Sequence, residues 1–335
     1  MKYAMERIIH NTLFSLCQTL FLLLFISFLT TSSALAMSGP SQPSEGPGGT
    51  DYFHSKVISN CYGSGALQYY LFEPDAPKPS TAPLVVFIHG FGGVRPSTYD
   101  SWIEHIVKKG NIVVFPVYQS IASSFSNFTS NTLKAVLDAI NKLQEENHVR
   151  PELDNFATVG HSVGGILSAN IAALAQKSGL PTVRAIMSVQ PGKSPLPKIE
   201  DLSKIPSDTL LLAVVGDRDT IAGDKDAKKI FYAAQQIPPE NKDFVTMVSD
   251  QYDFFSSLTA DHFAPCCTSS GGLGSGSDAD ALDYYCLWKL FDALTDAAFY
   301  NENREYALGN TPQQRYMGEW SDGRPVKELT VNDNP

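Results

Sequence analysis

The sequence predicts an α/β fold with a doubly wound, mostly parallel sheet, and three observations lead to this prediction. Short apolar runs alternate along the chain with longer amphipathic stretches. Two of the runs, residues 84–88 and 210–215, are apolar throughout, which is typical of parallel strands buried on both faces. The stretches between the runs are long enough for the helical crossovers that parallel strands need. With 335 residues, 43% hydrophobic and 18% charged, the chain has a globular composition, and we expect one main domain.

The individual elements follow from these patterns in chain order. Strands are expected where apolar runs lie between turn-forming residues, at 66–72, 84–88, 112–117, 156–160, 185–190, 209–215 and 244–248. Helices are expected in the amphipathic stretches 99–108, 132–144, 163–176 and 226–236.

The first 36 residues have the pattern of a secretory signal peptide. Lys2 and Arg7 precede an apolar run around residues 20–29, and Ala34-Leu35-Ala36 is a small-x-small cleavage pattern. An uncleaved signal anchor is the alternative, because the apolar stretch counted from Leu13 is near the lower limit for a membrane span. No later segment has the apolar length needed to cross a bilayer. We therefore expect a secreted or periplasmic protein without a stable membrane span.

Composition also divides the remainder of the chain. Residues 37–50 are rich in Ser, Pro and Gly and are expected to form a flexible linker. The folded domain is expected over residues 51–335, with a C-terminal extension from about residue 301 that packs against it. Residues 268–278, rich in Gly and Ser, are interpreted as a surface loop.

Charge and cysteine content bound the partners and the redox state. The net charge of −10 argues against nucleic acid, since phosphate binding needs clustered Lys and Arg. Cys61, Cys266, Cys267 and Cys286 follow the leader, an even number in a chain predicted to be exported, so disulfides are expected. A bond between the neighbours Cys266 and Cys267 would be strained, so each is expected to pair with Cys61 or Cys286. A zinc site is the competing interpretation, which the absence of ligand spacing disfavours.

Residues 160–164 read Gly-His-Ser-Val-Gly and match the pattern G-x-S-x-G. A predicted strand precedes the pattern and a predicted helix follows it, and the two glycines permit the tight turn between them. A chance match in a structural loop is the alternative, but the flanking elements favour Ser162 as a nucleophile.

A serine nucleophile needs a base and an orienting acid, which follow it in the order acid, then histidine. Asp219 lies in a loop after the predicted strand 209–215 and is assigned as the acid, with Asp217 as its rival. His262 is the only histidine after Ser162 and is assigned as the base. The remaining histidines, among them His161, are interpreted as structural.

The negative oxygen formed during attack must meet backbone N–H donors. One is expected from Val163, the residue after the nucleophile. The other is expected from the glycine-rich loop after residues 84–88, where Phe91 is the choice and Gly92 the next candidate. This chemistry requires no metal and no cofactor.

These motifs resemble one branch of the α/β-hydrolase superfamily, which holds chlorophyllases, dienelactone-hydrolase-like proteins, bacterial platelet-activating-factor acetylhydrolase homologues and cutinase-like polyesterases. The likeness runs from about Tyr69 to Trp288 and includes residues 85–91, 160–165, 219–222 and 261–263. The resemblance to cutinase-like members favours Asp219 over Asp217 and favours Phe91 as an oxyanion donor. The stretch from Cys266 to Cys286 matches none of these relatives.

The resemblance also bears on substrate. Lids in this superfamily usually follow the strand that corresponds to 185–190, and the short connection 191–208 leaves no room for a large cap. We expect an open cleft that takes small or polymeric esters, with Phe91, Tyr118 and Phe263 as aromatics that could line it. The predicted activity is hydrolysis of carboxylic esters. An acyltransferase or amidase with the same triad is one alternative, and an inactive hydrolase-fold binding protein is another.

Overall fold

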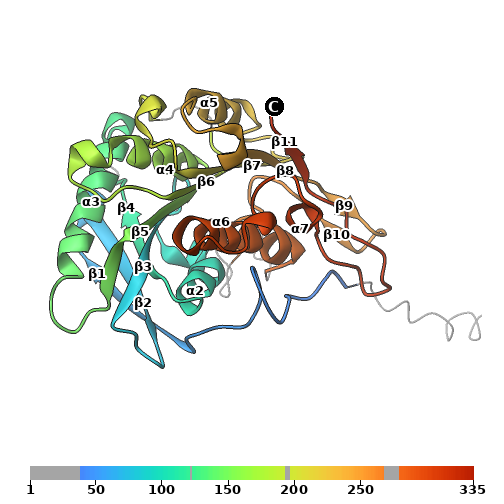
Figure 1. Ribbon diagram of the computed structural model, residues 1–335, viewed down its shortest axis with the longest axis horizontal. Coiled ribbons are helices and arrows are strands. Elements are labelled where there is room, and N and C mark those ends of the chain that lie inside the picture. The colour runs from blue at the N-terminus through green and yellow to red at the C-terminus, as the bar shows by residue number, and fades with distance from the viewer. Residues whose placement is uncertain (1–37, 121–122, 193–196, 268–278) are drawn as a thin grey trace, which may run out of the picture. The chain divides into compact units, whose positions relative to one another are not determined.

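A sheet of nine strands forms the centre of the unit Gly39–Pro335 (Figure 1). The computed structural model describes residues 38–335 except 121–122, 193–196 and 268–278, so the predicted leader and the predicted loop 268–278 lie outside the described residues. In chain order, the strands of this sheet are β1 (Lys56–Tyr62), β2 (Gln68–Asp75), β3 (Thr81–Ile88), β4 (Ile112–Val117), β5 (Arg150–His161), β6 (Ala185–Val189), β7 (Leu210–Gly216), β8 (Lys242–Met247) and β11 (Thr330–Asn332).

The strands lie in the order β1-β2-β4-β3-β5-β6-β7-β8-β11. The six strands from β4 to β8 run parallel, whereas β1, β2 and β11 pair antiparallel at the edges. A separate hairpin of β9 (Asp250–Gln251) and β10 (Ser257–Leu258) follows β8.

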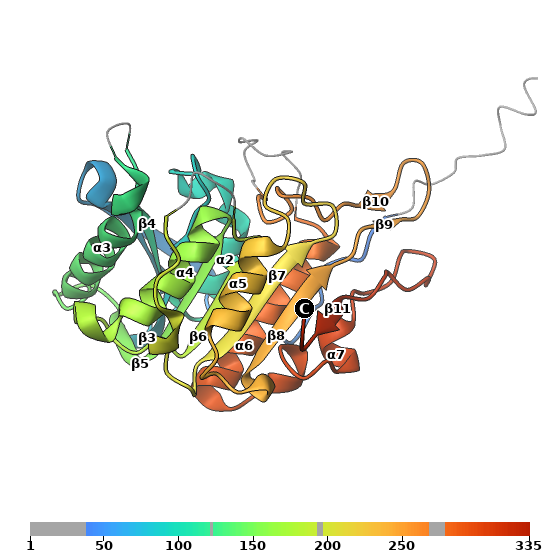
Figure 2. The same cartoon turned by 90° about the horizontal axis from the view of Figure 1, so that it is seen from above.

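Helices cover both faces of the sheet, with α3, α4 and α5 on one face and α2 and α6 on the other (Figures 1 and 2). Their bounds are α2 (Asp100–Lys108), α3 (Phe128–Lys142), α4 (Val163–Leu174), α5 (Lys225–Ala233), α6 (Lys289–Tyr300) and α7 (Pro312–Arg315). A π-helical turn, Asp283–Trp288, leads into α6. Short 3-10 turns occupy Gly65–Leu67, Pro96–Thr98, Phe125–Asn127, Gln176–Ser178, Leu202–Lys204, Pro239–Asn241 and Arg304–Tyr306.

Alternation along the inner strands creates the two cores. In β3, Val85 and Phe87 point to the face covered by α2, where Phe87 packs edge-on against Trp102. Leu84, Val86 and Ile88 pack in the core on the opposite face, under α3 and α4. Because both faces are buried, residues 84–88 of this strand are apolar throughout, as the sequence predicts.

The seven predicted strands and four predicted helices are all present, with ends that differ by a few residues. The connection between β6 and β7 carries no large cap: its described residues contain only the 3-10 turn Leu202–Lys204. Within the described part of the chain, none of the helices has the length and hydropathy needed to span a membrane.

The expected disulfides are not found, because Cys61, Cys266, Cys267 and Cys286 are all free thiols. Cys61 is exposed on the edge strand β1, whereas the other three are buried within the core beneath α6. The expectation rests on the even number of cysteines and on the predicted export, and neither shows whether two thiols approach each other.

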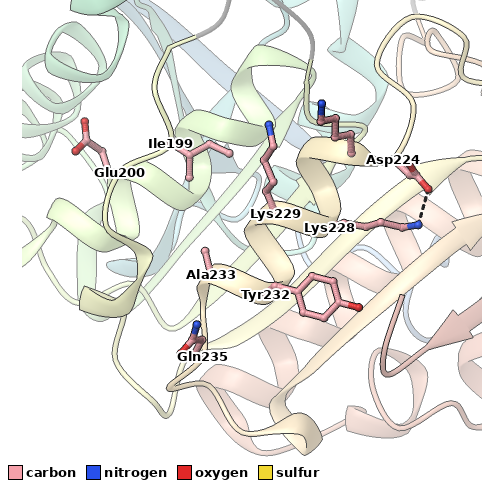
Figure 3. Close-up of a pocket in the computed structure, with 9 residues that line it drawn as sticks. Ile199, Glu200, Asp224, Lys228, Lys229, Tyr232, Ala233 and Gln235 are labelled. Carbon is pink, nitrogen blue, oxygen red and sulfur yellow. Dashed lines mark ion pairs between the residues drawn. The ribbon is translucent and has the colours of Figure 1, made fainter.

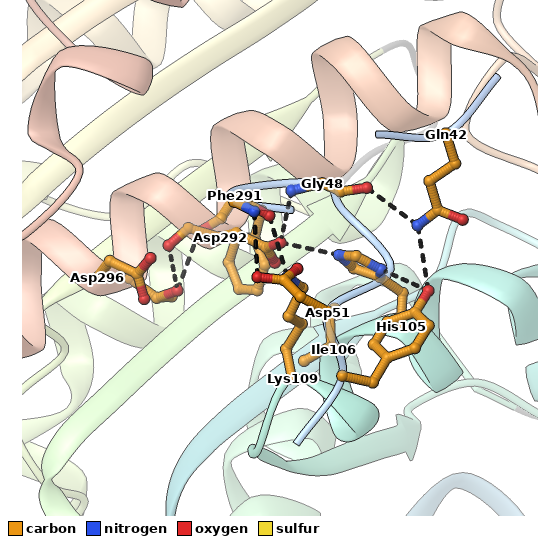
Figure 4. A network of polar contacts seen from close by, with 12 residues as sticks. Gln42, Gly48, Asp51, His105, Ile106, Lys109, Phe291, Asp292 and Asp296 are labelled. Atoms are coloured by element: carbon orange, nitrogen blue, oxygen red, sulfur yellow. Dashed lines mark hydrogen bonds and ion pairs between the residues drawn. The ribbon is translucent and has the colours of Figure 1, made fainter. Parts of the chain in front are cut away.

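The segment predicted as a linker, residues 37–50, is described from residue 38. Its described part packs against the domain: the Gly48 N–H donates to Asp292 Oδ2 on α6 over 2.8 Å, and His105 Nε2 of α2 lies 2.8 Å from the same oxygen (Figure 4). Tyr52 Oη contacts the other ring nitrogen of His105 at 3.1 Å. A short composition-biased segment is thus held by specific polar contacts that composition does not encode.

The C-terminal segment makes several contacts with the domain. Trp320 is buried and donates from Nε1 to Asp250 Oδ2 over 3.0 Å. The buried Lys289 of α6 donates to the carbonyl oxygens of Gln314 and Tyr316, and β11 then covers the open edge of β8.

Replacing Asp292 by Ala tests the polar contacts that hold the N-terminal segment. The change leaves the Gly48 N–H and His105 without their buried partner, so we expect a loss of about 2–4 kcal/mol in the free energy of unfolding. Denaturant unfolding measures it. Glu104→Ala, which removes an exposed ion pair with Lys108, serves as the control and should cost about 0.5 kcal/mol or less. Equal losses in the two variants would contradict the assignment.

Candidate active site

Ser162 occupies a sharp turn between β5 and α4. Its backbone has φ 56° and ψ −120°, a left-handed conformation that is strained for a residue with a side chain. The flanking glycines make the turn possible: a Cβ on Gly160 would overlap the carbonyl oxygen of Gly164, and one on Gly164 would overlap that of Ile88. The turn therefore presents Ser162 at the carboxyl edge of the sheet, at the N-terminus of a helix.

The structure brings Ser162, His262 and Asp219 into one chain of hydrogen bonds. His262 Nε2 lies 3.0 Å from Ser162 Oγ, and His262 Nδ1 lies 2.8 Å from Asp219 Oδ2. All three residues are buried, with 6 to 8% of their surface exposed. Ser162 follows β5, Asp219 follows β7 and His262 follows β10, so distant parts of the chain converge here.

Asp219 is poised as the charged partner of His262. Its Oδ1 accepts from the N–H groups of Ile221 and Ala222 at 2.9 and 2.8 Å, which leaves Oδ2 for the histidine. Burial alone would raise the pKa of Asp219, but the hydrogen bonds from His262 and from these N–H groups hold its pKa below the ordinary value.

The rival acid, Asp217, has other partners. It accepts from Ser249 Oγ at 2.5 Å and from the Ser249 N–H at 3.0 Å. Ser249 Oγ in turn accepts from the N–H of Ala260, two residues before His262. Asp217 therefore supports the histidine loop from a distance and does not contact the imidazole that Asp219 holds.

The two predicted oxyanion donors, Val163 and Phe91, belong to segments that lie next to Ser162. Val163 is the first residue of α4, where backbone N–H groups have no acceptor within the helix. On the other side, the loop after β3 approaches so closely that a Cβ on Gly90 would lie 3.2 Å from Ser162 Cβ. Phe91 follows Gly90 in this loop, and Gly92 adopts φ 87°.

Exposed apolar side chains surround the three polar residues. Phe91 is 62% exposed, Phe263 42% and Ile221 41%, and each is within two residues of a member of the site or its loop. Tyr118, which the sequence offered as a lining aromatic, is instead fully buried and stacks on His89 at 4.3 Å. It belongs to the core.

Two residues near the site belong to none of the motifs found in the sequence. Gln190 directly follows β6 and donates from Nε2 to the carbonyl oxygen of Asp261 over 2.6 Å. Tyr99 precedes α2, and its Oη lies 2.9 Å from Nδ1 of His161. The position of Gln190 at a strand's carboxyl end is a signal that sequence reasoning could have used; Tyr99 offers no comparable signal.

A separate hollow lies beside α5, and none of Ser162, Asp219 and His262 lines it (Figure 3). Two of its three lysines already have partners, since Lys228 pairs with Asp224 at 2.8 Å and Lys229 with Asp226 at 2.6 Å. Among the described residues, no group of three or more His, Cys, Asp or Glu side chains could hold a metal ion.

A mostly parallel sheet with helices on both faces and a serine on a sharp strand-to-helix turn is the architecture of the α/β-hydrolase fold. Residues 70–203, which are 134 of the 335 in the chain, match the family model Chlorophyllase, in agreement with the resemblance drawn from the motifs. This family consists of ester hydrolases. The matched stretch includes Ser162 and the loop after β3 but ends before Asp219 and His262. No match was found among the curated proteins.

Gly164→Ala tests the geometry of the turn. Its Cβ would collide with a backbone carbonyl of β3, which cannot move without displacing the central strand, so we expect a loss of about 3 kcal/mol or more in the free energy of unfolding. Ser168→Ala on the same helix is the control and should cost about 1 kcal/mol. Thermal and denaturant unfolding compare them, and a Gly164→Ala protein as stable as wild type would show that the turn is not packed as described.

Proposed function

We propose that this protein hydrolyses carboxylic esters through an acyl-enzyme on Ser162. The observation that carries the proposal is the continuous hydrogen-bond chain from Ser162 Oγ through His262 to Asp219, placed on a strained turn. The family match to residues 70–203 supports an ester hydrolase independently of that geometry.

In the proposed reaction, Ser162 Oγ attacks the ester carbonyl while His262 Nε2 takes its proton. Asp219 Oδ2 accepts from Nδ1–H, which fixes the tautomer that leaves Nε2 free to act as a base. The imidazolium then protonates the departing alcohol. Water, activated by the same histidine, releases the acid and restores Ser162.

The negative oxygen of the tetrahedral intermediate would be stabilised by the N–H groups of Val163 and Phe91. The N-terminus of α4 favours negative charge at this point because its first N–H groups and the helix dipole both point toward it. The close approach of Gly90 to Ser162 brings the second loop within reach.

The surroundings favour an accessible substrate with an apolar acyl group. Phe91, Ile221 and Phe263 present apolar surface beside the site, and the described connection after β6 contributes no cap. Small esters and the surface of a polymeric ester both fit this description; the family match does not by itself assign chlorophyll. The pattern of residues 1–36 leads us to propose that the protein is exported.

An acyltransferase or amidase would use the same acyl-enzyme and differ in the acceptor or the leaving group. No contact described here favours either over hydrolysis. A hydrolase-fold binding protein without activity is disfavoured because the three residues are hydrogen-bonded in the productive order.

Ser162→Ala is the primary test. We expect wild type to hydrolyse p-nitrophenyl butyrate and to be labelled by a fluorophosphonate, and we expect the variant to lose about 10⁶-fold in kcat and all labelling. Ser168→Ala, a buried serine on the same helix, should retain both activities. An inert wild type, or a Ser162→Ala protein that matches it, would refute the proposal.

Asp219→Asn and Asp217→Asn distinguish the two acids. Asparagine at 219 offers an amide donor to Nδ1 and favours the wrong tautomer, so kcat should fall by about 10⁴-fold. Asp217→Asn weakens only the Ser249 contact and should cost about 10-fold or less. Steady-state kinetics with the same ester measure both; the opposite ranking would assign the role to Asp217.

A further inference from the structure

The loop that carries His262 is held by three successive backbone carbonyls. Ala260 O accepts from the Arg218 N–H at 3.2 Å, Asp261 O accepts from Gln190 Nε2 at 2.6 Å, and His262 O contacts His161 Nε2 at 2.8 Å. The partners come from the loop before Asp219, from the end of β6 and from the residue before Ser162. Arg218 precedes Asp219 and His161 precedes Ser162 in the chain. Gln190 follows β6, which lies between β5 and β7 in the sheet.

The contact from His161 fixes the protonation of its ring. A carbonyl oxygen can only accept, so Nε2 of His161 must carry a proton and donate it to His262 O. Burial, together with the neighbouring His262, lowers the pKa of His161 to about 3, so the ring is neutral at physiological pH. Nδ1 is then an acceptor, and Tyr99 Oη at 2.9 Å is its donor.

Tyr99 connects this contact to the loop after β3, which contains Gly90 and the predicted oxyanion donor Phe91. Its hydroxyl proton goes to His161, and its oxygen accepts from the Gly90 N–H at 3.0 Å. The hydrogen bonds thus run in one direction, from Gly90 through Tyr99 and His161 to the carbonyl of His262. Tyr99 and His161 are 1% and 3% exposed, so water does not compete for these groups.

Gln190 holds the same loop from the other side at a local cost. It adopts φ 44°, which is strained for a glutamine, and its Oε1 is buried with no partner among the described residues. Gly216 permits the approach, because a Cβ there would overlap the carbonyl oxygen of Ala260 and crowd Gln190 Nε2. Gln190 thus keeps a strained backbone and an unsatisfied side-chain oxygen while its amide nitrogen donates to Asp261 O.

The histidine loop has little regular structure of its own. Only the two-residue strand β10 precedes it, and α6 begins far downstream. Its position therefore depends on contacts with neighbouring elements, among them these three hydrogen bonds and the one from the Ala260 N–H to Ser249 Oγ.

We propose that Tyr99, His161 and Gln190 are positioning residues that hold the backbone of His262 in register with Ser162 and couple it to the loop of Gly90. This inference rests on the proposed function. None of the three touches the substrate or the reacting atoms; they act on the base through its main chain.

Tyr99→Phe is the central test, with Tyr69→Phe as its matched control. Both tyrosines are 1% exposed. Tyr99→Phe removes two hydroxyl hydrogen bonds, to His161 and from Gly90, whereas Tyr69→Phe removes one, which Tyr69 donates to Asp138 at 2.7 Å, away from the triad. We expect kcat for p-nitrophenyl butyrate, per site titrated with fluorophosphonate, to fall about 10-fold in Tyr99→Phe with KM changed less than about 2-fold. Tyr69→Phe should lose thermal stability but keep wild-type kcat.

Substitutions of His161 and Gln190 provide the second arm. His161→Leu and Gln190→Leu should each lower kcat by about 10- to 100-fold, whereas His161→Gln, which keeps an N–H donor, should recover part of the loss. Unchanged kcat in Tyr99→Phe and in both leucine variants would overturn the proposal, as would equal kcat in His161→Gln and His161→Leu.

Hydrogen exchange of the peptide containing His262 gives a readout that does not need activity. It should accelerate in Tyr99→Phe and not in Tyr69→Phe if the loop is held as proposed. A wild type that neither hydrolyses nor labels would refute the proposed function alone, since exchange would still decide the role of these residues. Equal exchange in the two tyrosine variants would refute the positioning role even in an active enzyme.

Discussion

The close contact between strand β3 and the turn from β5 to α4 is the constraint on which the rest of the site depends. Gly164 lies against the carbonyl of Ile88 without room for a side chain, and this draws the loop of Gly90 against Ser162. Ser162 then takes a left-handed backbone at a cost of about 1–3 kcal/mol. The hydrogen bond from its N–H to Val189 O, 2.9 Å long, holds that conformation. Ser162, the N-terminus of α4 and the loop of Gly90 meet because Gly164 allows the close approach.

The interior of the fold could be predicted from sequence and its periphery could not. The inner strands are buried on both faces, so their sequences are continuous apolar runs that can be recognised. Strand β1 is mostly exposed and β11 has three residues, so neither leaves such a pattern. Helix α6 was missed because its buried positions include Lys289 and Asp292, which interrupt the expected apolar stripe. These polar residues hold the two terminal segments, a role that periodicity does not encode.

Ser162 and His262 were singled out by a motif and by chain order, and their hydrogen bond agrees with that choice, while their catalytic roles stay a prediction. Neither a motif nor chain order points to Tyr99 or Gln190, because Gln190 contacts a backbone carbonyl and Tyr99 contacts a backbone N–H and the ring of His161. The disulfide prediction was wrong for a related reason: the number of cysteines in the sequence does not show where their side chains lie. Burial raises the pKa of Cys266 and Cys286 to about 12, as expected of inert thiols that serve the core rather than of bridge partners.

The variable position after the first glycine of G-x-S-x-G is occupied here by His161, and this position is not independent of the rest of the chain. A residue at position 161 that lacks the two ring nitrogens of histidine cannot donate to His262 O. It also leaves the hydroxyl of Tyr99, 62 residues away in sequence, without its acceptor. We therefore expect substitutions at positions 99 and 161 to occur together. Grafting residues 160–164 alone into another protein of this fold would transfer Ser162 and His161 and leave behind Tyr99, whose hydroxyl contacts the ring of His161.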